Sequence, residues 1–419
     1  MIEGSAKMSG ERCRVCDAEL EHVFVDLGMS PIANDYVPAE EANAMEPFYP
    51  LRVYVCGRCW LVQLPAAQSA DNIFRDDYAY FSSVSQSWLE HARNYVEKVI
   101  ERFGIGPEQS VVEIASNDGY LLQYFKAHSV PVLGIEPCGN VAMAAENIGV
   151  PTITRFFGRE LASQLAEEKN KPDLIVGNNV LAHVPDLRDF VGGLKILLAD
   201  DGVITMEFPH LVRLIELNQF DTIYHEHFSY FSLHAVLNVF EIHGLRIFDV
   251  DELGTHGGSL RIYACHEDDE REATGDAVGE LFERERQAGI GELEIYKDFE
   301  KKVHRTKREL LKFLISAREA GKSVVGYGAP AKGNTLLNYC GVGTDFLDYT
   351  VDRAPSKQGT LLPGTRIPVY EPDRILETQP DYVLILPWNI KDEIMAGMSV
   401  VRKWGGQFVV PIPEVRLLD

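Results

Sequence analysis

Short apolar runs alternate with helical segments from residue 110 onward, and this alternation restricts the possible fold more than any other feature of the chain. Their spacing matches repeated βαβ units, in which buried strands form a parallel sheet. The expected strands are Val111–Ile114, Val132–Ile135, Leu174–Val176 and Val203–Glu207. Two more, Arg246–Val250 and Ser259–Ala264, flank a segment that fits a hairpin and would add an antiparallel edge. The sequence therefore predicts an α/β protein with a Rossmann-like central sheet.

A second, smaller alternation begins at residue 322. Its expected strands are Ser323–Tyr327, Phe346–Val351 and Tyr382–Leu386, and helical segments lie between them. The chain has 419 residues, which is too long for one ordinary core. We therefore expect three domains: a small N-terminal module (residues 11–70), a central α/β domain (71–300) and a second, smaller Rossmann-like domain (301–419). An amphipathic helix is expected near Ser87–Phe103.

Two C-x-x-C motifs lie in the N-terminal module. They place Cys13 beside Cys16 and Cys56 beside Cys59, while the other three cysteines stand alone. In a chain of the cytosol, paired motifs of this kind favour a metal over disulfides. Four thiolates suit tetrahedral zinc, and a closed four-cysteine site is structural. The alternatives are two redox pairs or free buried thiols.

The charge balance limits the possible partners. The chain has 40 basic and 63 acidic residues, a net charge of −23, which argues against nucleic acid or an anionic membrane as the main partner. It has no apolar run of about 18 residues, so no transmembrane helix is expected. The first residues lack the apolar core of a secretory signal. We expect a cytoplasmic protein.

The first strand runs into a tight turn of small residues, Ala115 to Gly119, followed by a helix. Such a turn brings the backbone close to a ligand and points helix N–H groups at it. About 20 residues later, the second strand ends at Glu136, where an acid can bind a ribose diol. Enzymes that use NAD and class I S-adenosylmethionine methyltransferases share this geometry. Only Gly119 remains of a glycine-rich phosphate motif, which favours S-adenosylmethionine; a turn without a ligand is the alternative.

The third strand is followed by Asn178, Asn179 and His183. Ligands of open α/β sheets bind beyond the carboxyl ends of the strands. These side chains are therefore expected at the same edge of the sheet as Glu113 and Glu136. For His183, a helix start satisfied by the backbone is an equally good interpretation.

Residues 224–227 read Tyr-His-Glu-His within an aromatic run. Four adjacent polar side chains are costly to bury unless they are paired, and histidine titrates near neutral pH. If the segment is extended, His225 and His227 share one face; if it is helical, Tyr224 and His227 do. The cluster indicates a proton-transfer centre. Metal binding and surface histidines are the weaker alternatives.

Glycines and one lysine follow the strand Ser323–Tyr327, in the segment Gly326 to Asn334. This pattern is typical of a phosphate-binding turn, and Lys332 would supply its positive charge. Asp352 and Arg353 end the next strand, where a nucleoside diphosphate could meet them. Packing glycines in an α/β unit are the alternative.

The order of these motifs along nearly the whole chain resembles that of nucleotide-sugar C-methyltransferases of deoxysugar biosynthesis. The similar segments are the paired C-x-x-C module, Glu113–Gly119, Asn178–His183, Tyr224–His227, His256–Arg261 and Gly326–Ala329. One difference is Ala115, at a place where relatives often have glycine. The resemblance implies structural zinc, a central domain that binds S-adenosylmethionine, and a C-terminal domain that helps to hold a dTDP-linked 4-keto-6-deoxyhexose.

The resemblance also implies roles for individual residues. His227 would remove the proton beside the ketone, with Tyr224 and Glu226 polarising it or stabilising the enolate, and with His183 and Tyr78 contacting the sugar. The residues expected to bind the cofactor are Glu113, Ala115, Asn117, Gly119, Glu136, Asn178 and Asn179. Those expected to bind the substrate are Gly328, Lys332, Asn334, Arg353 and His225. The alternatives are an NAD(P)-dependent nucleotide-sugar oxidoreductase and a non-catalytic zinc scaffold.

Overall fold

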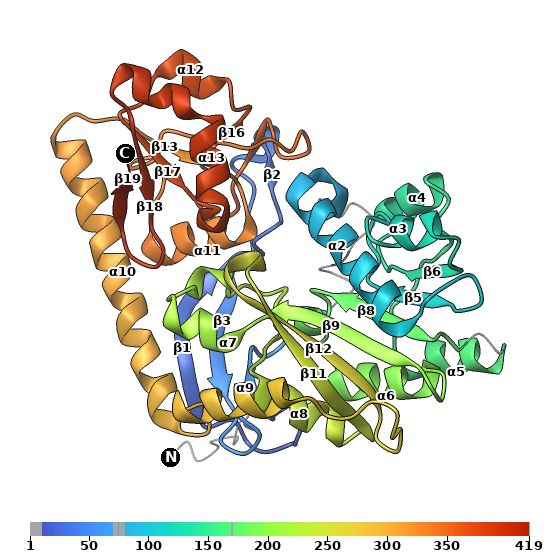
Figure 1. The fold of residues 1–419 in the computed structure, drawn as a ribbon. Helices are drawn as coiled ribbons and strands as arrows, with labels where there is room; N and C mark the ends of the chain where they lie inside the picture. Colours follow the sequence, from blue (N-terminus) through green and yellow to red (C-terminus); the bar gives the residue numbers. More distant parts are fainter. Residues whose placement is uncertain (1–10, 70–73, 75–79, 169–170, 419) are drawn as a thin grey trace, which may run out of the picture.

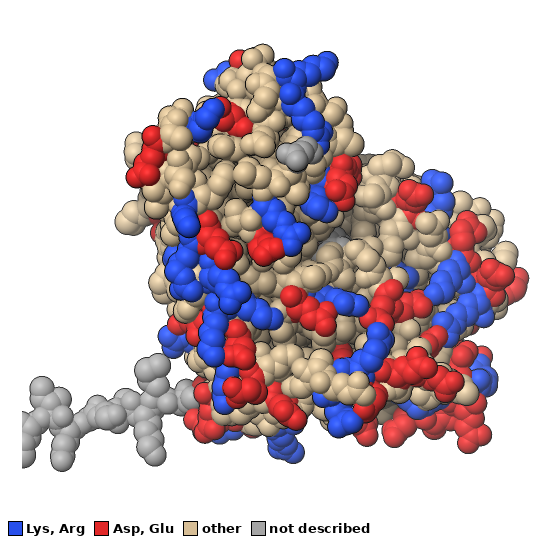
Figure 2. Space-filling view, turned by 60° about the vertical axis from the view of Figure 1, so that its left-hand side comes forward, with Lys and Arg blue, Asp and Glu red and all other residues tan. Residues whose placement is uncertain are grey.

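The structure is a computed structural model that describes residues 11–69, 74, 80–168 and 171–418. An N-terminal module, a central α/β part and a C-terminal α/β part surround a common centre, and one long helix, α10 (Leu293–Glu319), runs along one side of the molecule (Figure 1). No helix within these residues is long and apolar enough to cross a membrane. On the face drawn in Figure 2, basic side chains lie among acidic ones.

The central part contains a seven-stranded sheet of order β11-β12-β9-β8-β5-β6-β7. Its strands are β5 (Val111–Ile114), β6 (Val132–Ile135), β7 (Thr152–Ile153), β8 (Leu174–Asn178), β9 (Val203–Pro209), β11 (Leu245–Leu253) and β12 (Ser259–His266). The first five are parallel, while β12 pairs antiparallel with both β9 and β11. The expected parallel sheet with an antiparallel edge is confirmed, and β5 and β6 have the expected bounds.

Helices precede, connect and follow the strands of the central part, in keeping with the apolar periodicity of these segments. They are α2 (Gln86–Phe103), α3 (Leu122–Ala127), α4 (Gly139–Asn147), α5 (Arg159–Glu167), α6 (Leu187–Leu197), α7 (Leu211–Glu216), α8 (Leu233–Glu241) and α9 (Asp276–Gln287). Helix α2 begins at a serine cap, where Ser85 accepts from the Trp88 N–H, and it ends at Gly104 in the left-handed conformation. Its course matches the expected amphipathic helix.

The N-terminal module shares a four-stranded sheet with the central part. The strand order is β1-β3-β4-β10, from β1 (His22–Ser30), β3 (Tyr49–Val55), β4 (Val62–Gln63) and β10 (Ser229–Tyr230). Strand β10 comes two residues after the Tyr-His-Glu-His segment. A second link, the antiparallel pair β2 (Val37–Pro38) and β15 (Thr360–Leu361), ties the module to the C-terminal part. The N-terminal module therefore joins the other two parts.

The C-terminal part is a six-stranded sheet of order β16-β14-β13-β17-β18-β19. Its elements are β13 (Val324–Tyr327), α11 (Ala331–Cys340), β14 (Thr350–Val351), β16 (Val369–Tyr370), α12 (Arg374–Thr378), β17 (Tyr382–Ile385), α13 (Lys391–Gly397), β18 (Gln407–Val410) and β19 (Arg416–Leu418). The strand expected at Phe346–Val351 is shorter because the N–H groups of Phe346 and Leu347 both bind the Gly343 carbonyl in a turn.

One hydrophobic core runs from the N-terminal module through α10 into the C-terminal sheet. Phe24 of β1 stacks on Phe299 of α10, with ring centroids 4.5 Å apart. The domain boundary expected at residue 300 falls inside this helix. We propose that the C-terminal domain begins with α10, because the helix packs as one unit.

Candidate functional site

A cavity of about 390 Å³ lies where the three parts meet. This volume is within the usual range for small-ligand sites. The N-terminal module contributes Asn34 and the C-terminal part contributes Pro330, Ala331, Lys332 and Lys357. The rest of its wall comes from the central part, at the carboxyl ends of the parallel strands. Ligands of α/β sheets bind at this edge.

The turn after β5 forms one end of the cavity. The Asn117 N–H donates to Glu136 Oε2 and the Cys138 N–H to Oε1, each over 2.9 Å. The Asn117 side chain in turn accepts from the Ser82 N–H over 2.9 Å. Glu136 is 4% exposed and faces the cavity with a fixed carboxyl group, as a ribose-binding acid requires.

Two residues of this turn other than glycine have left-handed backbones. Ala115 has φ of 56° and Asn117 has φ of 48°; both line the cavity. Asparagine tolerates this conformation, whereas alanine is strained in it. The strain explains why glycine is the expected residue at position 115. It is compensated by the fixed turn, in which the Ala115 N–H binds the Ile135 carbonyl over 2.7 Å.

Two expected cofactor residues lie behind the turn and do not line the cavity. Glu113 is fully buried, and the Tyr120 side chain is the hydrogen-bonding group that acts on its carboxyl. Burial raises its pKa well above the ordinary value. Gly119 packs against the C-terminal end of α4, since an added Cβ would lie 3.1 Å from Ile148 and 3.3 Å from Ala145. Both residues therefore shape the turn from beneath.

Asn178 and Asn179 line the cavity at the end of β8. Asn178 is 3.4 Å from the Tyr120 hydroxyl, and the Asn179 N–H donates to the Glu207 carbonyl over 2.7 Å. Next comes η3 (Leu181–His183), which turns His183 toward the cavity. Burial lowers the pKa of His183 to about 4, so its imidazole is neutral at pH 7.

The Tyr-His-Glu-His segment is a tight turn, neither extended nor helical. The His227 N–H donates to the Tyr224 carbonyl over 2.9 Å. The turn brings the rings of Tyr224 and His227 together, with centroids 4.0 Å apart. The His183 ring centroid lies 4.7 Å from that of His227. All three, together with Glu226, line the cavity. Burial raises the pKa of Tyr224 well above its ordinary value, so its hydroxyl stays protonated.

The contact with Thr222 fixes the ring state of His227. Its Nδ1 lies 2.7 Å from the Thr222 carbonyl oxygen, which can only accept. In the neutral imidazole the proton is therefore on Nδ1 and the lone pair on Nε2. Glu226 is 2% exposed and accepts from Asn34 Nδ2 over 2.7 Å.

His225 points away from the cavity. Its Nε2 lies 3.2 Å from the Pro50 carbonyl, and its ring meets Tyr49 edge-on at 5.9 Å, both on β3. It is 2% exposed, and burial lowers its pKa. The structure thus separates the two histidines of the motif: His227 faces the cavity, and His225 joins the turn to the N-terminal module.

Lys332 and Lys357 form the C-terminal wall. Lys332 Nζ donates to Asn389 over 2.7 Å, and burial lowers its pKa to about 8 although Asp221 opposes this. Lys357 donates to the Ala329 carbonyl over 2.8 Å. Burial opposes its charge too, but Tyr36 and Asp352 outweigh burial and raise its pKa. Two cations thus meet the cavity of a strongly acidic protein.

Three expected substrate residues of the C-terminal part do not line the cavity. Gly328 packs tightly, since an added Cβ would lie 2.5 Å from Pro387. Asn334 donates to the Ala33 carbonyl over 2.6 Å and so holds the N-terminal module. Arg353 is exposed and pairs with Glu393 at 3.0 Å. Tyr78 lies outside the described residues.

Some residues of the site carry no clear signal in the sequence. Asn34, Trp88, Arg155 and Thr222 line the cavity but belong to no motif. Asn34 reaches the cavity from the N-terminal module, through contacts between parts that are distant in the sequence.

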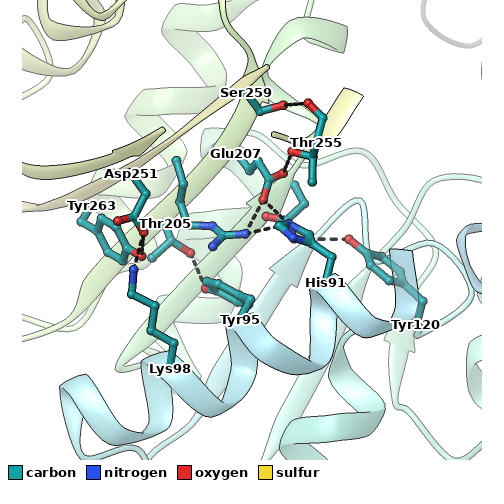
Figure 3. A network of polar contacts seen from close by, with 12 residues as sticks. His91, Tyr95, Lys98, Tyr120, Thr205, Glu207, Asp251, Thr255, Ser259 and Tyr263 are labelled. Atoms are coloured by element: carbon teal, nitrogen blue, oxygen red, sulfur yellow. Dashed lines mark hydrogen bonds and ion pairs between the residues drawn. The ribbon is translucent and has the colours of Figure 1, made fainter. Parts of the chain in front are cut away.

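A buried polar network supports the central sheet beside the cavity (Figure 3). Its centre is Glu207 of β9, which is fully buried. Glu207 accepts from Arg261 of β12, from Thr255 over 2.9 Å and from His91 of α2 over 2.8 Å. Burial opposes ionisation, but His91 and Arg261 outweigh it and lower the Glu207 pKa to about 2. The ring of Trp88, which lines the cavity, stacks on His91 with centroids 4.9 Å apart.

The two C-x-x-C motifs meet in the N-terminal module. The four sulfur atoms lie within 4.8 Å of one another; Cys13 and Cys59 are 3.5 Å apart, as are Cys16 and Cys56. Tetrahedral zinc with bonds of about 2.3 Å needs sulfur separations of about 3.8 Å, so the set fits this ion. Gln63 donates to Cys13 Sγ over 3.2 Å, as second-sphere groups of metal thiolates do.

Three family models match the chain. A zinc binding domain matches residues 13–74, a methyltransferase domain matches residues 88–250, and a C-methyltransferase C-terminal domain matches residues 254–413. Among curated proteins, the C-methyltransferase NovU of Streptomyces niveus is 38% identical over 409 residues, which cover 98% of this chain and 97% of that protein.

Solved structures resemble parts of the fold. One is magnesium protoporphyrin IX methyltransferase (ChlM) of Synechocystis PCC 6803 with bound SAM, 13% identical with a TM-score of 0.37, covering 48% of this chain and 100% of that one. Another is the PH0226 protein of Pyrococcus horikoshii OT3, 13% identical with a TM-score of 0.37, covering 45% of this chain and 95% of that one.

The predicted α/β class, zinc-binding module and methyltransferase domain are confirmed by the family models and the cysteine cluster. The oxidoreductase and scaffold alternatives are not retained, because both the central and the C-terminal family models are those of methyltransferases. Because NovU is 38% identical to it along 98% of this chain, the protein belongs to the C-methyltransferase family.

Proposed function

We propose that this enzyme transfers a methyl group from S-adenosylmethionine to the carbon beside the ketone of a dTDP-linked 4-keto-deoxysugar. The observation that carries the proposal is the composition of one cavity. It combines a ribose-type acid, Glu136, with the base candidate His227 and the two half-buried cations Lys332 and Lys357. Methyl donor, reacting carbon and diphosphate would each meet suitable groups within one enclosed space.

The chemistry begins with proton removal. The lone pair of His227 Nε2 takes the proton beside the ketone, and the C–H electrons move into an enolate. The Tyr224 hydroxyl, kept protonated by burial, donates a hydrogen bond to the developing enolate oxygen. His183, neutral at pH 7, leaves the imidazolium of His227 without a second positive charge beside it.

Bound S-adenosylmethionine supplies an electrophilic methyl group, whose bond to sulfur breaks as the new carbon–carbon bond forms, with the electron pair staying on sulfur. On the protein side, the fixed turn 115–119 and Glu136 orient the donor. The apolar rings of Trp88, Phe157 and Phe190 line the same cavity and exclude water. The residues thus form the carbanion and protect it.

A panel of dTDP-linked keto-sugars tests the proposal. In deuterated buffer with S-adenosylhomocysteine, the correct sugar gains deuterium at the carbon beside the ketone; with S-adenosylmethionine, the same carbon gains a methyl group in place of its proton. Mass spectrometry and proton NMR identify the carbon. Methyl transfer to oxygen or nitrogen, without any exchange at carbon, would contradict the proposal.

A further inference from the structure

The segment that leads to His227 is held by groups of the C-terminal part that take no share in the proposed chemistry. This segment begins with η4 (Phe220–Thr222), and α11 packs directly on it. Thr335 Oγ1 of α11 donates to the Ile223 carbonyl over 2.9 Å. The rings of Phe220 and Tyr339 meet edge-on at 5.5 Å. The backbone beside His227 therefore depends on a contact between parts far apart in sequence.

Asp221, in the middle of η4, makes a second, shorter hydrogen bond to the C-terminal part. It is fully buried, and its Oδ2 accepts from the indole Nε1 of Trp388 over 2.6 Å. Trp388 opens η6 (Trp388–Ile390), at the end of β17. Within the described residues, Asp221 Oδ1 has no hydrogen-bond partner. The indole N–H is thus the main side-chain partner of a buried acid, and its loss would be costly.

Lys332 fixes the same indole from its face. Its Nζ lies 4.5 Å from the ring centroid of Trp388, within the range of a cation–π contact. Burial raises the pKa of Asp221 to about 6, while Lys332 and the indole N–H act to lower it. In addition to burial, the carboxyl in turn acts to raise the pKa of Tyr224 and of Cys340, two other titratable groups close to it. At neutral pH the charge of Lys332 favours the ionised acid.

The contact leads to the reacting group through one peptide unit. Asp221 precedes Thr222, whose carbonyl accepts from Nδ1 of His227 over 2.7 Å. Turning the Thr222–Ile223 peptide, which carries this carbonyl, would remove the acceptor that selects the ring tautomer. Hydrogen bonding of one ring nitrogen decides which nitrogen carries the proton.

We propose that Asp221 and Trp388 are positioning residues that hold the Thr222 carbonyl against His227 and so keep the lone pair on Nε2. Neither residue touches the reacting atoms; both act through Thr222. The C-terminal part thus sets the ring state of the base, in addition to supplying cations to the cavity. The inference rests on the proposed function only in the role given to Nε2.

Nitrogen NMR of the protein labelled with [¹⁵N]histidine tests the inference without substrate. The signals of His227 are assigned by their loss in His227→Asn. The native protein is expected to show the Nδ1-protonated tautomer. Trp388→Phe keeps the ring and removes the donor, and is expected to give comparable populations of both tautomers. Trp404→Phe is the matched control, because its Nε1 donates to the Pro380 carbonyl over 3.0 Å in the same part of the chain.

Two substitutions of the acid give a second route to the answer if Trp388→Phe does not fold. Asp221→Asn retains an oxygen that accepts from the indole and is expected to keep the native tautomer; Asp221→Leu is expected to lose it. An unchanged His227 spectrum in Trp388→Phe or Asp221→Leu overturns the inference, and so does an equal change in Trp404→Phe.

Deuterium exchange of the substrate tests the effect of the same variant on the function of His227. Deuterium exchange of the keto-sugar is expected to fall about tenfold in Trp388→Phe, with the affinity for S-adenosylhomocysteine unchanged, since misplaced groups lose rate before binding. If the native protein exchanges no keto-sugar, the proposed function fails, while the spectra still decide whether Trp388 and Asp221 position His227.

Discussion

Two chemically identical side chains, one on each side of Glu226, have different surroundings in this protein. His227 lines the cavity and bonds to Thr222, whereas His225 is buried against β3. Sequence patterns place both in one polar cluster. The tight turn that separates them depends on the strand β10 joining the sheet of the N-terminal module. A sequence window of a few residues does not contain that pairing.

Substituting the two histidines separates their roles. His227→Asn is expected to reduce methyl transfer about 10²–10⁴-fold, the usual contribution of a general base. His225→Asn is expected to leave turnover within a few-fold and to lower thermal stability, because its contact with Pro50 is buried. Calorimetric titration with S-adenosylhomocysteine checks that both variants bind the cofactor normally. Equal activities of the two variants would contradict the assignment of His227.

Ala115 offers a test of backbone strain at a single residue. At its φ of 56°, a residue with a Cβ is less stable than glycine by roughly 1–2 kcal/mol. Glycine also makes the unfolded chain more flexible, which cancels part of this advantage. Ala115→Gly is therefore expected to raise the free energy of unfolding by up to about 1 kcal/mol. Urea-induced unfolding measures the difference. The control is Ala127→Gly in α3, where the same change is expected to destabilise.

At the scale of elements, the sequence predicts most of what local periodicity controls. Strands β5 and β6, the parallel order and the antiparallel edge formed by β11 and β12 are confirmed. Apolar runs and turns within about 30 residues are enough for these features. The contacts between distant elements are different: the pairing of β4 with β10 and of β2 with β15 joins segments that share no pattern. Asn34 reaches the cavity from the N-terminal module through contacts of this kind, and no sequence pattern predicts it.

The network around Glu207 joins α2, β9 and β12. Its contribution to the free energy of unfolding of the protein should depend on pH. The pKa of Glu207 is lowered from 4.5 to about 2, so its stabilising effect is present above pH 4.5 and is lost as the pH falls toward 2. At about 1.4 kcal/mol per pH unit of difference, this corresponds to about 3 kcal/mol. Urea unfolding of the native protein and Glu207→Gln between pH 6 and pH 3 measures it.

The difference in stability between the two proteins should narrow as the pH decreases. Glu160→Gln is a suitable control, because its ion pair with Arg155 is exposed and contributes little. A stability difference for Glu207→Gln that stays constant across this pH range would show that the network does not depend on the ionised carboxylate.

For the whole molecule, the three parts act together because none of them encloses the cavity alone. The N-terminal module fixes Glu226 through Asn34, the central part supplies the turn 115–119 with Glu136, and the C-terminal part supplies Lys332. The common core through α10 makes their relative placement a property of the fold. The affinity of a ligand that extends from the turn 115–119 to Lys332 should therefore depend on the charge of Lys332.

The affinity for dTDP is accordingly expected to change with pH. Burial holds the pKa of Lys332 at about 8, and a bound diphosphate would raise it. Affinity is then greatest below pH 8 and decreases between pH 8 and the higher pKa of the complex, the range in which binding takes up a proton. Above pH 7 the charge of the ligand itself changes little. Calorimetric titrations of the protein saturated with S-adenosylhomocysteine, from pH 7 to pH 9.5, measure both quantities.

Substitution of single cations assigns this pH dependence to one residue. Lys332→Met is expected to weaken binding at pH 7 and to abolish both the pH dependence and the proton uptake. Arg353→Met removes an exposed cation of the same part that does not line the cavity and is expected to behave like the native protein. If the pH dependence survives in Lys332→Met, the titrating group is not Lys332. Lys357, whose pKa is raised, would then have to hold the diphosphate without help from Lys332.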